Sequence, residues 1–219
     1  KDPYALRRAA LGVIRLLLEN KHKANLLSLF TFAADAHGSG QFDDQNRADL
    51  LGFFHDRLKV YLRDSGARHD LIDAVITPQS DDLLTITRRV SALADFLSSD
   101  DGLNLLAGTK RAANILAAEE KKGTLISDAV VESLLEDGAE KALNYAVNQA
   151  GQTASQAIEN EDFSAAMLAL AELRGPVDSF FEDVMVNVDD GKVRANRLAL
   201  MRRIRDATQT VADFSKIAG

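Results

Sequence analysis

Apolar residues recur at intervals of three and four along almost the whole chain, and this spacing restricts the fold more than any other feature of the sequence. Near the start it appears in Leu6, Ala10, Val13 and Leu17, which it places on one face of an α-helix. The alternation that is typical of β-strands is found only at residues 184–188. We therefore predict an all-α fold made of two packed helical bundles.

A short polar segment near the middle of the chain is the best candidate for a domain boundary. It consists of Ser98, Ser99, Asp100, Asp101 and Gly102, and it contains no bulky apolar residue. The sequence thus predicts a helical body at residues 1–101 and a second helical bundle at residues 102–219.

Within the second bundle, helical spacing and turn residues predict a series of helices. They cover residues 103–121, 128–158 and 162–173. A further segment lies near residues 177–186, and a final long helix runs to about Ile217. Gly175-Pro176 is expected to act as a hinge between two of these helices, because both residues interrupt regular structure.

The charge of the chain is unevenly distributed. A net charge of −7 disfavours a protein that coats nucleic acid indiscriminately, and we expect no binding to DNA. Residues 189–205 nevertheless hold six Lys or Arg against two acids, whereas residues 132–162 hold seven acids against one Lys. An acidic chain can therefore still present a basic strip.

Three further features of the sequence concern the cellular location of the protein, its relation to membranes and the extent of the chain. The chain has no cysteine, which excludes disulfides and thiolate metal sites and is compatible with the reducing cytoplasm, where we expect it. No run approaches the roughly 20 apolar residues of a membrane span, so we expect no membrane partner. The chain begins at Lys1 rather than Met, directly at an expected helix start, and we expect a fragment of a longer protein.

The sequence contains little that points to catalysis. His55-Asp56 and His69-Asp70 both form the His-Asp dyad of a metal-dependent phosphohydrolase superfamily, but that site needs further His and Asp ligands that the sequence does not pair with either dyad. No glycine-rich phosphate loop and no Gly-x-Ser-x-Gly motif is present. We therefore expect no metal, and an HD-type hydrolase would require one.

The last predicted helix combines a core face with a basic face. Its core-facing seam is formed by Val193, Leu200, Ile204, Ala207, Val211 and Phe214. A different face carries Arg194, Arg202, Arg205 and Lys216, and the seam is flanked by Arg197 and Arg203. Arginine suits phosphate because its planar guanidinium donates two hydrogen bonds and keeps its charge. A solvated helix surface is the alternative interpretation, here and for a second strip of Lys110, Arg111 and Asn114.

Several stretches of the chain resemble a known family. Residues 2–12 (DPYALRRAALG), 53–58 (FFHDRL), 69–75 (HDLIDAV) and 110–116 (KRAANIL) are similar to the bacterial glycyl-tRNA synthetase β subunit. Residues 176–188 (PVDSFFEDVMVNV), 194–200 (RANRLAL) and 211–217 (VADFSKI) resemble the helical anticodon-binding domain that this family shares with arginyl- and cysteinyl-tRNA synthetases. The similarity extends in order from residue 1 to the end.

The resemblance implies a division of labour. In this family a separate α subunit carries the class II catalytic site that activates glycine with ATP, and the β subunit holds the tRNA. Residues 1–101 then correspond to the C-terminal part of the HD-like middle region, where the dyads are not the metal ligands of the family, and residues 102–219 to the anticodon-binding domain. The chain alone is expected to catalyse nothing and to bind no cofactor, with tRNA-Gly and the α subunit as its partners.

The candidate RNA contacts follow from this assignment. They are Arg194, Arg197, Arg202, Arg205, Asn196 and Asn187, with Lys110, Arg111 and Asn114 in second place. The basic side chains are expected to hold phosphates, and the asparagines to hydrogen-bond base edges. The rival is a helical structural or docking module for subunit assembly, which an exposed apolar patch without an adjoining basic groove would favour.

Overall fold

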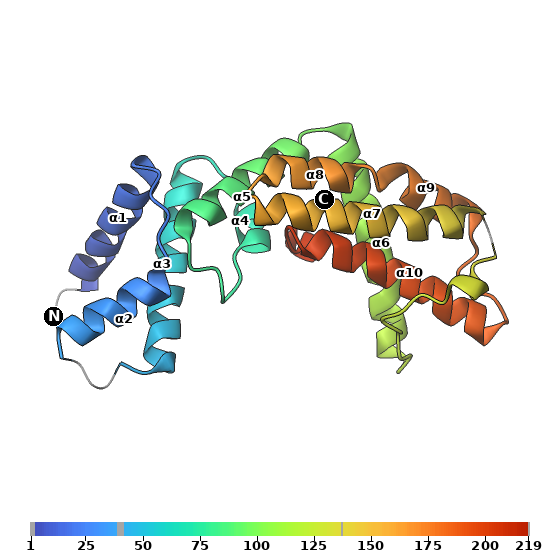
Figure 1. The fold of residues 1–219 in the computed structure, drawn as a ribbon, viewed down its shortest axis with the longest axis horizontal. Coiled ribbons are helices and arrows are strands. Elements are labelled where there is room, and N and C mark those ends of the chain that lie inside the picture. Colours follow the sequence, from blue (N-terminus) through green and yellow to red (C-terminus); the bar gives the residue numbers. More distant parts are fainter. Residues whose placement is uncertain (1–2, 39–41, 137, 219) are drawn as a thin grey trace. The chain divides into compact units, whose positions relative to one another are not determined.

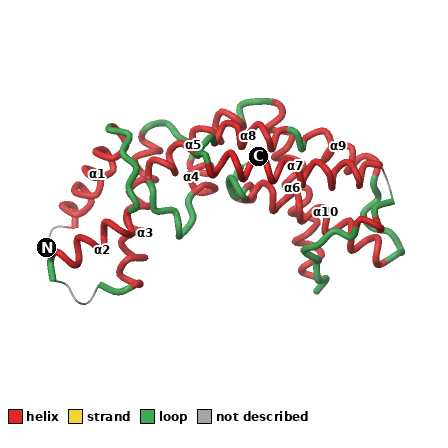
Figure 2. Tube along the Cα trace, in the orientation of Figure 1, coloured by secondary structure: helices red, strands yellow, loops and turns green. Residues whose placement is uncertain are grey.

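The computed structural model describes residues 3–38, 42–136 and 138–218, and Figures 1 and 2 show that the regular structure of these residues is helical throughout. Lys1, at the expected helix start, lies outside them. The helices are α1 (Pro3–Glu19), α2 (Leu26–Ala36), α3 (Asp44–Asp64), α4 (His69–Val75), α5 (Leu83–Phe96), α6 (Asp100–Lys121), η1 (Glu132–Leu134), α7 (Gly138–Glu159), α8 (Phe163–Ala171), α9 (Arg174–Asp183), α10 (Gly191–Gln209) and η2 (Phe214–Lys216). The predicted all-α fold is confirmed. None of the described helices has both the length and the apolar character needed to cross a bilayer.

The chain divides into two compact units, the first ending at Ser91 and the second beginning at Ala92. In the first unit, α1 and α2 both pack against the longer α3. Its core includes Ile14, Leu26 and Leu58, which are fully buried. The domain boundary expected between residues 101 and 102 stays a prediction.

The second unit is built around α10, which packs against α6 and α7, while α8 and α9 pack against α7 (Figure 1). Helices α6 and α9 approach closely at Gly108, where an added Cβ would lie 2.6 Å from a methyl carbon of Val177. Glycine therefore belongs at this position because the crossing leaves no room for a side chain.

Three predictions about helix limits in the second unit are wrong. Residues 128–136 are not part of a long helix with α7, because they form a connecting segment in which the side chain of Asn196 from α10 binds the backbone of Val131. Gly175-Pro176 is not a hinge: both lie in the first turn of α9, where the missing proline N–H leaves no helical bond unmade.

The last helix also ends earlier than Ile217. Helix α10 stops at Gln209, and the N–H groups of Val211 and Ala212 both donate to the carbonyl of Thr208 at 3.1 Å, which closes a turn. Asp213 then caps the short η2 by accepting from the N–H of Ser215 at 3.1 Å. Lys216 consequently belongs to η2 and does not extend the basic face of α10.

Candidate nucleic-acid interface

Helix α10 is packed on more sides than its sequence indicates. The predicted seam is confirmed, since each of its residues is buried: Val193, Leu200, Ile204, Ala207, Val211 and Phe214. The buried set is wider, however, because the five other residues from Asn196 to Met201 are buried as well. A helix that is enclosed in this way must satisfy its polar side chains inside the protein.

Arg197 is the clearest example. Its side chain is only 9% exposed and forms an ion pair with Glu140 of α7, whose side chain is 1% exposed. Its other guanidinium nitrogens donate to the carbonyl of Met185 at 2.9 Å and pair with Glu136 at 3.3 Å. The structure thus places Arg197 in a buried polar network, and its role as an RNA contact stays a prediction.

Asn196 is occupied in a similar way. Its side-chain oxygen accepts from the N–H of Val131 at 2.7 Å, and its amide nitrogen donates to the carbonyl of the same residue at 3.1 Å. Since Asn196 is buried, this pair of bonds replaces the water that the backbone of Val131 would otherwise bind. Asn196 anchors the segment between α6 and α7, and its prediction as a base-edge contact is at odds with this environment.

Arg194 lies at the start of α10 and reaches α6. It forms an ion pair with Glu119, and its Nε donates to the side-chain oxygen of Asn187 at 3.0 Å. Glu119 also accepts from Lys122 at 2.9 Å and from Thr124 at 3.1 Å. Hydrogen bonds from Lys122 and then Arg194 lower the pKa of Glu119 to about 2.

Arg202 and Arg205 complete the basic face of α10, and both are about a quarter to a third exposed. Arg202 donates to the carbonyl of Ile126 at 3.1 Å and forms an ion pair with Asp128. Arg205 lies 3.6 Å from a carboxylate oxygen of Glu120. The predicted basic face is therefore neutralised, arginine by arginine, by acids of other elements.

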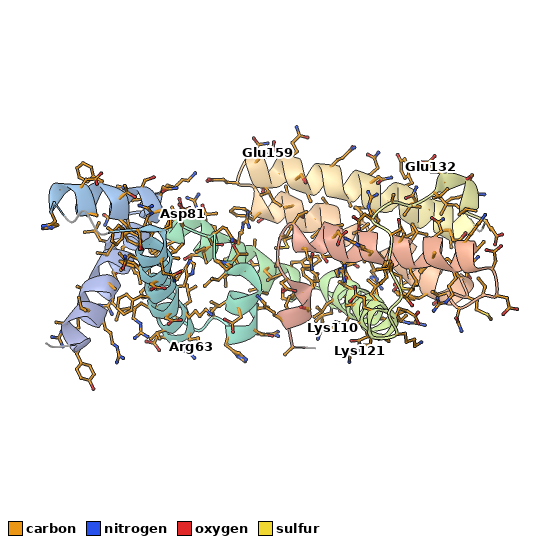
Figure 3. All side chains as sticks on the ribbon, turned by 90° about the horizontal axis from the view of Figure 1, so that it is seen from below. Arg63, Asp81, Lys110, Lys121, Glu132 and Glu159 are labelled. Carbon is orange, nitrogen blue, oxygen red and sulfur yellow. The ribbon has the colours of Figure 1, made fainter. Side chains whose placement is uncertain are left out.

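The strip predicted on α6 has the opposite character. Lys110, Asn114 and Lys121 follow one another at helical spacing, and Figure 3 labels both lysines on this helix. Among the described residues, Lys110, Arg111 and Lys121 form no ion pair. Arg111 instead lies over the ring of Phe181 from α9, with its guanidinium carbon 4.4 Å from the ring centre. We call Lys110, Arg111, Asn114 and Lys121 the α6 strip.

The two His-Asp dyads lie in the first unit and are not arranged as metal sites. The buried His55 makes a 2.6 Å hydrogen bond through Nε2 to the carbonyl oxygen of Ser80. Asp70 is buried and accepts from Arg68 at 2.5 and 3.1 Å. Within residues 3–38, 42–136 and 138–218, no three His, Asp or Glu side chains come together as a set that could hold a metal ion.

Sequence reasoning missed the acids that bind the α10 arginines. Glu136 and Glu140 come from the acidic stretch 132–162, and they meet Arg197 from the basic stretch 189–205. Two blocks of opposite charge in one bundle are the signal that could have indicated this pairing. Glu119 carries no such signal, because it lies among the lysines at the end of α6.

Comparison with known proteins agrees with this architecture. Residues 1–77 match the family model of the glycyl-tRNA synthetase β subunit, and residues 105–213 match that of the DALR anticodon binding domain. The glycine–tRNA ligase β subunit of Paracoccus denitrificans is 50% identical over 221 residues, which cover 100% of this chain and 31% of that protein. The chain thus spans about a third of the length of this relative. It belongs to the glycyl-tRNA synthetase β-subunit family, and its second unit contains a DALR-type anticodon-binding domain.

Proposed function

We propose that the chain binds tRNA through its second unit, as the anticodon-recognition part of a glycine–tRNA ligase. The observation that carries this proposal is the match of residues 105–213 to an anticodon-binding domain, in a chain that is 50% identical to a glycine–tRNA ligase β subunit. Aminoacylation of tRNA-Gly belongs, in this proposal, to a separate catalytic α subunit. That subunit binds ATP and glycine, and the present chain uses no cofactor and acts in the cytoplasm without catalysing a reaction itself.

The α6 strip is the proposed place for the first phosphate contacts. An anion that approaches Lys110, Arg111 or Lys121 does not have to displace a carboxylate, because these cations form no ion pair within the described residues. Ala107, one turn before Lys110, and Ala117 and Ala118, between Arg111 and Lys121, are exposed, and their small side chains leave the helix surface open to an approaching ligand. The exposed Asn114 lies within the strip, where its amide can bind a base edge or a sugar hydroxyl.

The arginines of α10 have a different role in this proposal. Arg194, Arg202 and Arg205 are held by Glu119, Asp128 and Glu120, so a phosphate would have to compete with a carboxylate that is already in place. We infer that they chiefly tie α10 to α6 and, through Arg202, to the segment between α6 and α7, and that they make a secondary contribution to binding. Asn187 is exposed and remains a candidate base contact beside Arg194.

A filter-binding titration of the 219-residue chain tests the proposal. It uses tRNA-Gly with its native anticodon, the same tRNA with an altered anticodon, and an unrelated tRNA, at several salt concentrations. We expect measurable affinity for all three and the tightest binding for the native anticodon, because phosphate contacts are general and base contacts are selective. Equal affinity for the three RNAs would contradict anticodon recognition, and no binding at low salt would contradict tRNA binding by this chain.

A docking role is the second candidate function, and a specific observation favours it. Large apolar side chains are exposed on α1 and α2 of the first unit, among them Leu6 and Phe32. Such side chains suit a protein partner rather than RNA phosphates. The two functions are compatible, since they concern different units of the chain.

A further inference from the structure

Helix α1 is apolar on two adjacent faces, but only one of them is covered. Ala10, Ile14 and Leu17 are buried in the first unit, where α1 packs against α3. The neighbouring face carries Leu6, Ala9, Val13 and Leu16, which we call the outer stripe of α1. Its larger side chains are 68%, 42% and 60% exposed at Leu6, Val13 and Leu16.

Helix α2 repeats this arrangement. It buries only Leu26 and Phe30, while Leu29 is 47% and Phe32 is 74% exposed. Its one charged residue is Asp35, so the exposed surface of the helix is largely apolar. Both α1 and α2 therefore leave an apolar face uncovered.

The exposed apolar side chains are concentrated in this region. Of the twelve large hydrophobic residues that are exposed in the described part of the chain, six lie between Tyr4 and Phe32. Single exposed apolar residues are ordinary on protein surfaces, but a group on two neighbouring segments marks an interaction site. The region is thus distinguished from the second unit, whose exposed apolar residues are scattered over several helices and loops.

The geometry of the outer stripe fits another helix. Its residues are spaced three, four and three apart, which is the repeat by which two helices pack along a common seam. Ala9 has a small side chain and Gly12 has none, so they form a shallow depression beside the larger residues of the stripe. A Cβ added at Gly12 would meet no atom within 4 Å. A second helix can therefore approach α1 closely.

We propose that the outer stripe of α1, together with Leu29 and Phe32 of α2, docks on apolar helices of the remaining part of the glycyl-tRNA synthetase β subunit. The relative from Paracoccus denitrificans matches this chain over only 31% of its length, so most of a β subunit lies outside the region described here. Residues 1–77, which contain both exposed faces, are the part that matches the β-subunit family itself. The proposal rests on family membership and not on tRNA binding.

The test compares one set of substitutions in two settings, the 219-residue chain and the full-length β subunit that contains it. The stripe variant combines Leu6→Gln, Val13→Gln and Leu16→Gln, which keep good helix formers on α1. A matched control combines Leu103→Gln, Tyr145→Gln and Leu168→Gln, three exposed residues of the second unit. Thermal unfolding is measured in both settings, together with the oligomeric state of the short chain and its binding to anionic phospholipid vesicles.

We expect the stripe variant to leave the unfolding midpoint of the short chain nearly unchanged, because the replaced side chains make few contacts there. In the full-length β subunit the stripe variant should lower the midpoint of the first thermal unfolding transition by at least about 5 °C. The control variant should shift the midpoint only slightly, and by the same amount in the short chain and in the full-length subunit. Binding of tRNA-Gly to the short chain should be the same for wild type and stripe variant. A failure of tRNA binding by the wild type would therefore leave this proposal unaffected.

Other results would overturn it. If the stripe variant has the same effect in both settings, the remaining part of the β subunit does not cover α1. If the short chain is a dimer that the stripe variant converts to a monomer, the outer stripe binds a second copy of the chain. If the short chain binds vesicles and the stripe variant does not, the outer stripe binds a lipid surface. Should the triple variant lose helical structure, Leu16→Gln alone decides between the same outcomes.

Discussion

Helices α10 and α6 of the second unit are both long and both carry a row of cations, yet they use these cations in opposite ways. The arginines of α10 meet carboxylates on other elements, as Arg197 meets Glu140 and Arg194 meets Glu119. The cations of the α6 strip form no ion pair among the described residues, and Lys121 is exposed to solvent. A row of positive charges in a sequence therefore indicates either a binding surface or an internal network of ion pairs. Which of the two it is depends on whether acidic residues of other segments pair with the cations in the folded protein.

The largest expected effect is on the internal network of α10. Arg197→Ala should lower the free energy of unfolding by about 3–5 kcal/mol, because it leaves the buried Glu140 carboxylate without its guanidinium. Urea unfolding followed by circular dichroism measures this loss. The double variant Arg197→Met with Glu140→Leu should recover most of it, and a loss below about 1 kcal/mol in the single variant would mean that the pair is accessible to water.

A slightly smaller loss is expected in the apolar seam of the same helix. Ile204 is fully buried, so Ile204→Ala should destabilise the chain by about 2–5 kcal/mol through the cavity that it creates. The control is Leu125→Ala, since Leu125 is 96% exposed and its truncation should change the stability by no more than about 0.5 kcal/mol. Equal effects of the two substitutions would contradict the central position of α10.

Asn196→Ala should cost less, about 1–3 kcal/mol, because it leaves the N–H and carbonyl of Val131 without their side-chain partner. Hydrogen exchange around Val131 should accelerate more than exchange within α7. Were Asn196 instead a base reader, its removal would leave stability and exchange unchanged and would reduce only the discrimination between anticodons.

A pH-dependent effect is expected at Glu119. Its pKa is lowered to about 2 from an ordinary value of 4.5, so its stabilising contribution is complete above about pH 4.5 and is lost as the pH falls from there toward 2. The difference in stability between wild type and Glu119→Gln should therefore shrink over this window. Urea midpoints between pH 7 and pH 2.5 measure it, and a difference that does not change with pH would rule out the lowered pKa.

The smallest effect on stability is expected in the α6 strip. Replacing Lys110 or Lys121 by Ala should change the unfolding free energy by no more than about 0.5 kcal/mol per site. Arg111→Ala should cost about 0.5–1 kcal/mol, because it also removes the contact with the ring of Phe181. Each lost phosphate contact should flatten the dependence of log affinity on log salt by roughly 0.7–0.9, to a similar degree for any tRNA.

The control for the strip replaces Lys141 and Lys192, two exposed lysines elsewhere in the second unit, and should leave the salt slope unchanged. An unchanged slope in the strip variant would place the phosphate contacts elsewhere. The paired arginines Arg194, Arg202 and Arg205 would then be the next candidates, and the contrast between α6 and α10 would be reversed.

The sequence by itself determined the helical class of the fold and the core-facing seam of its last helix. Apolar spacing is a local property of the chain, and it identified the seam from Val193 to Phe214, whose residues are all buried. Likewise, α3 ends two residues before Gly66, which has a φ of +94°, a conformation that other residues rarely adopt. Features of this kind depend on neighbours in sequence and are therefore visible without a structure.

Only the tertiary structure decided which polar residues are free to bind a partner. Arg197 and Asn196 were predicted as RNA contacts from the basic face and the family resemblance, and the residues that bind them in the structure come from α7 and from the segment around Val131. The sequence likewise did not indicate that the outer stripe of α1 is exposed, since Leu6 and Ala10 belong to one apolar pattern but only Ala10 is buried. Burial and ion pairing join residues that are distant in sequence, and the spacing along one helix does not contain that information.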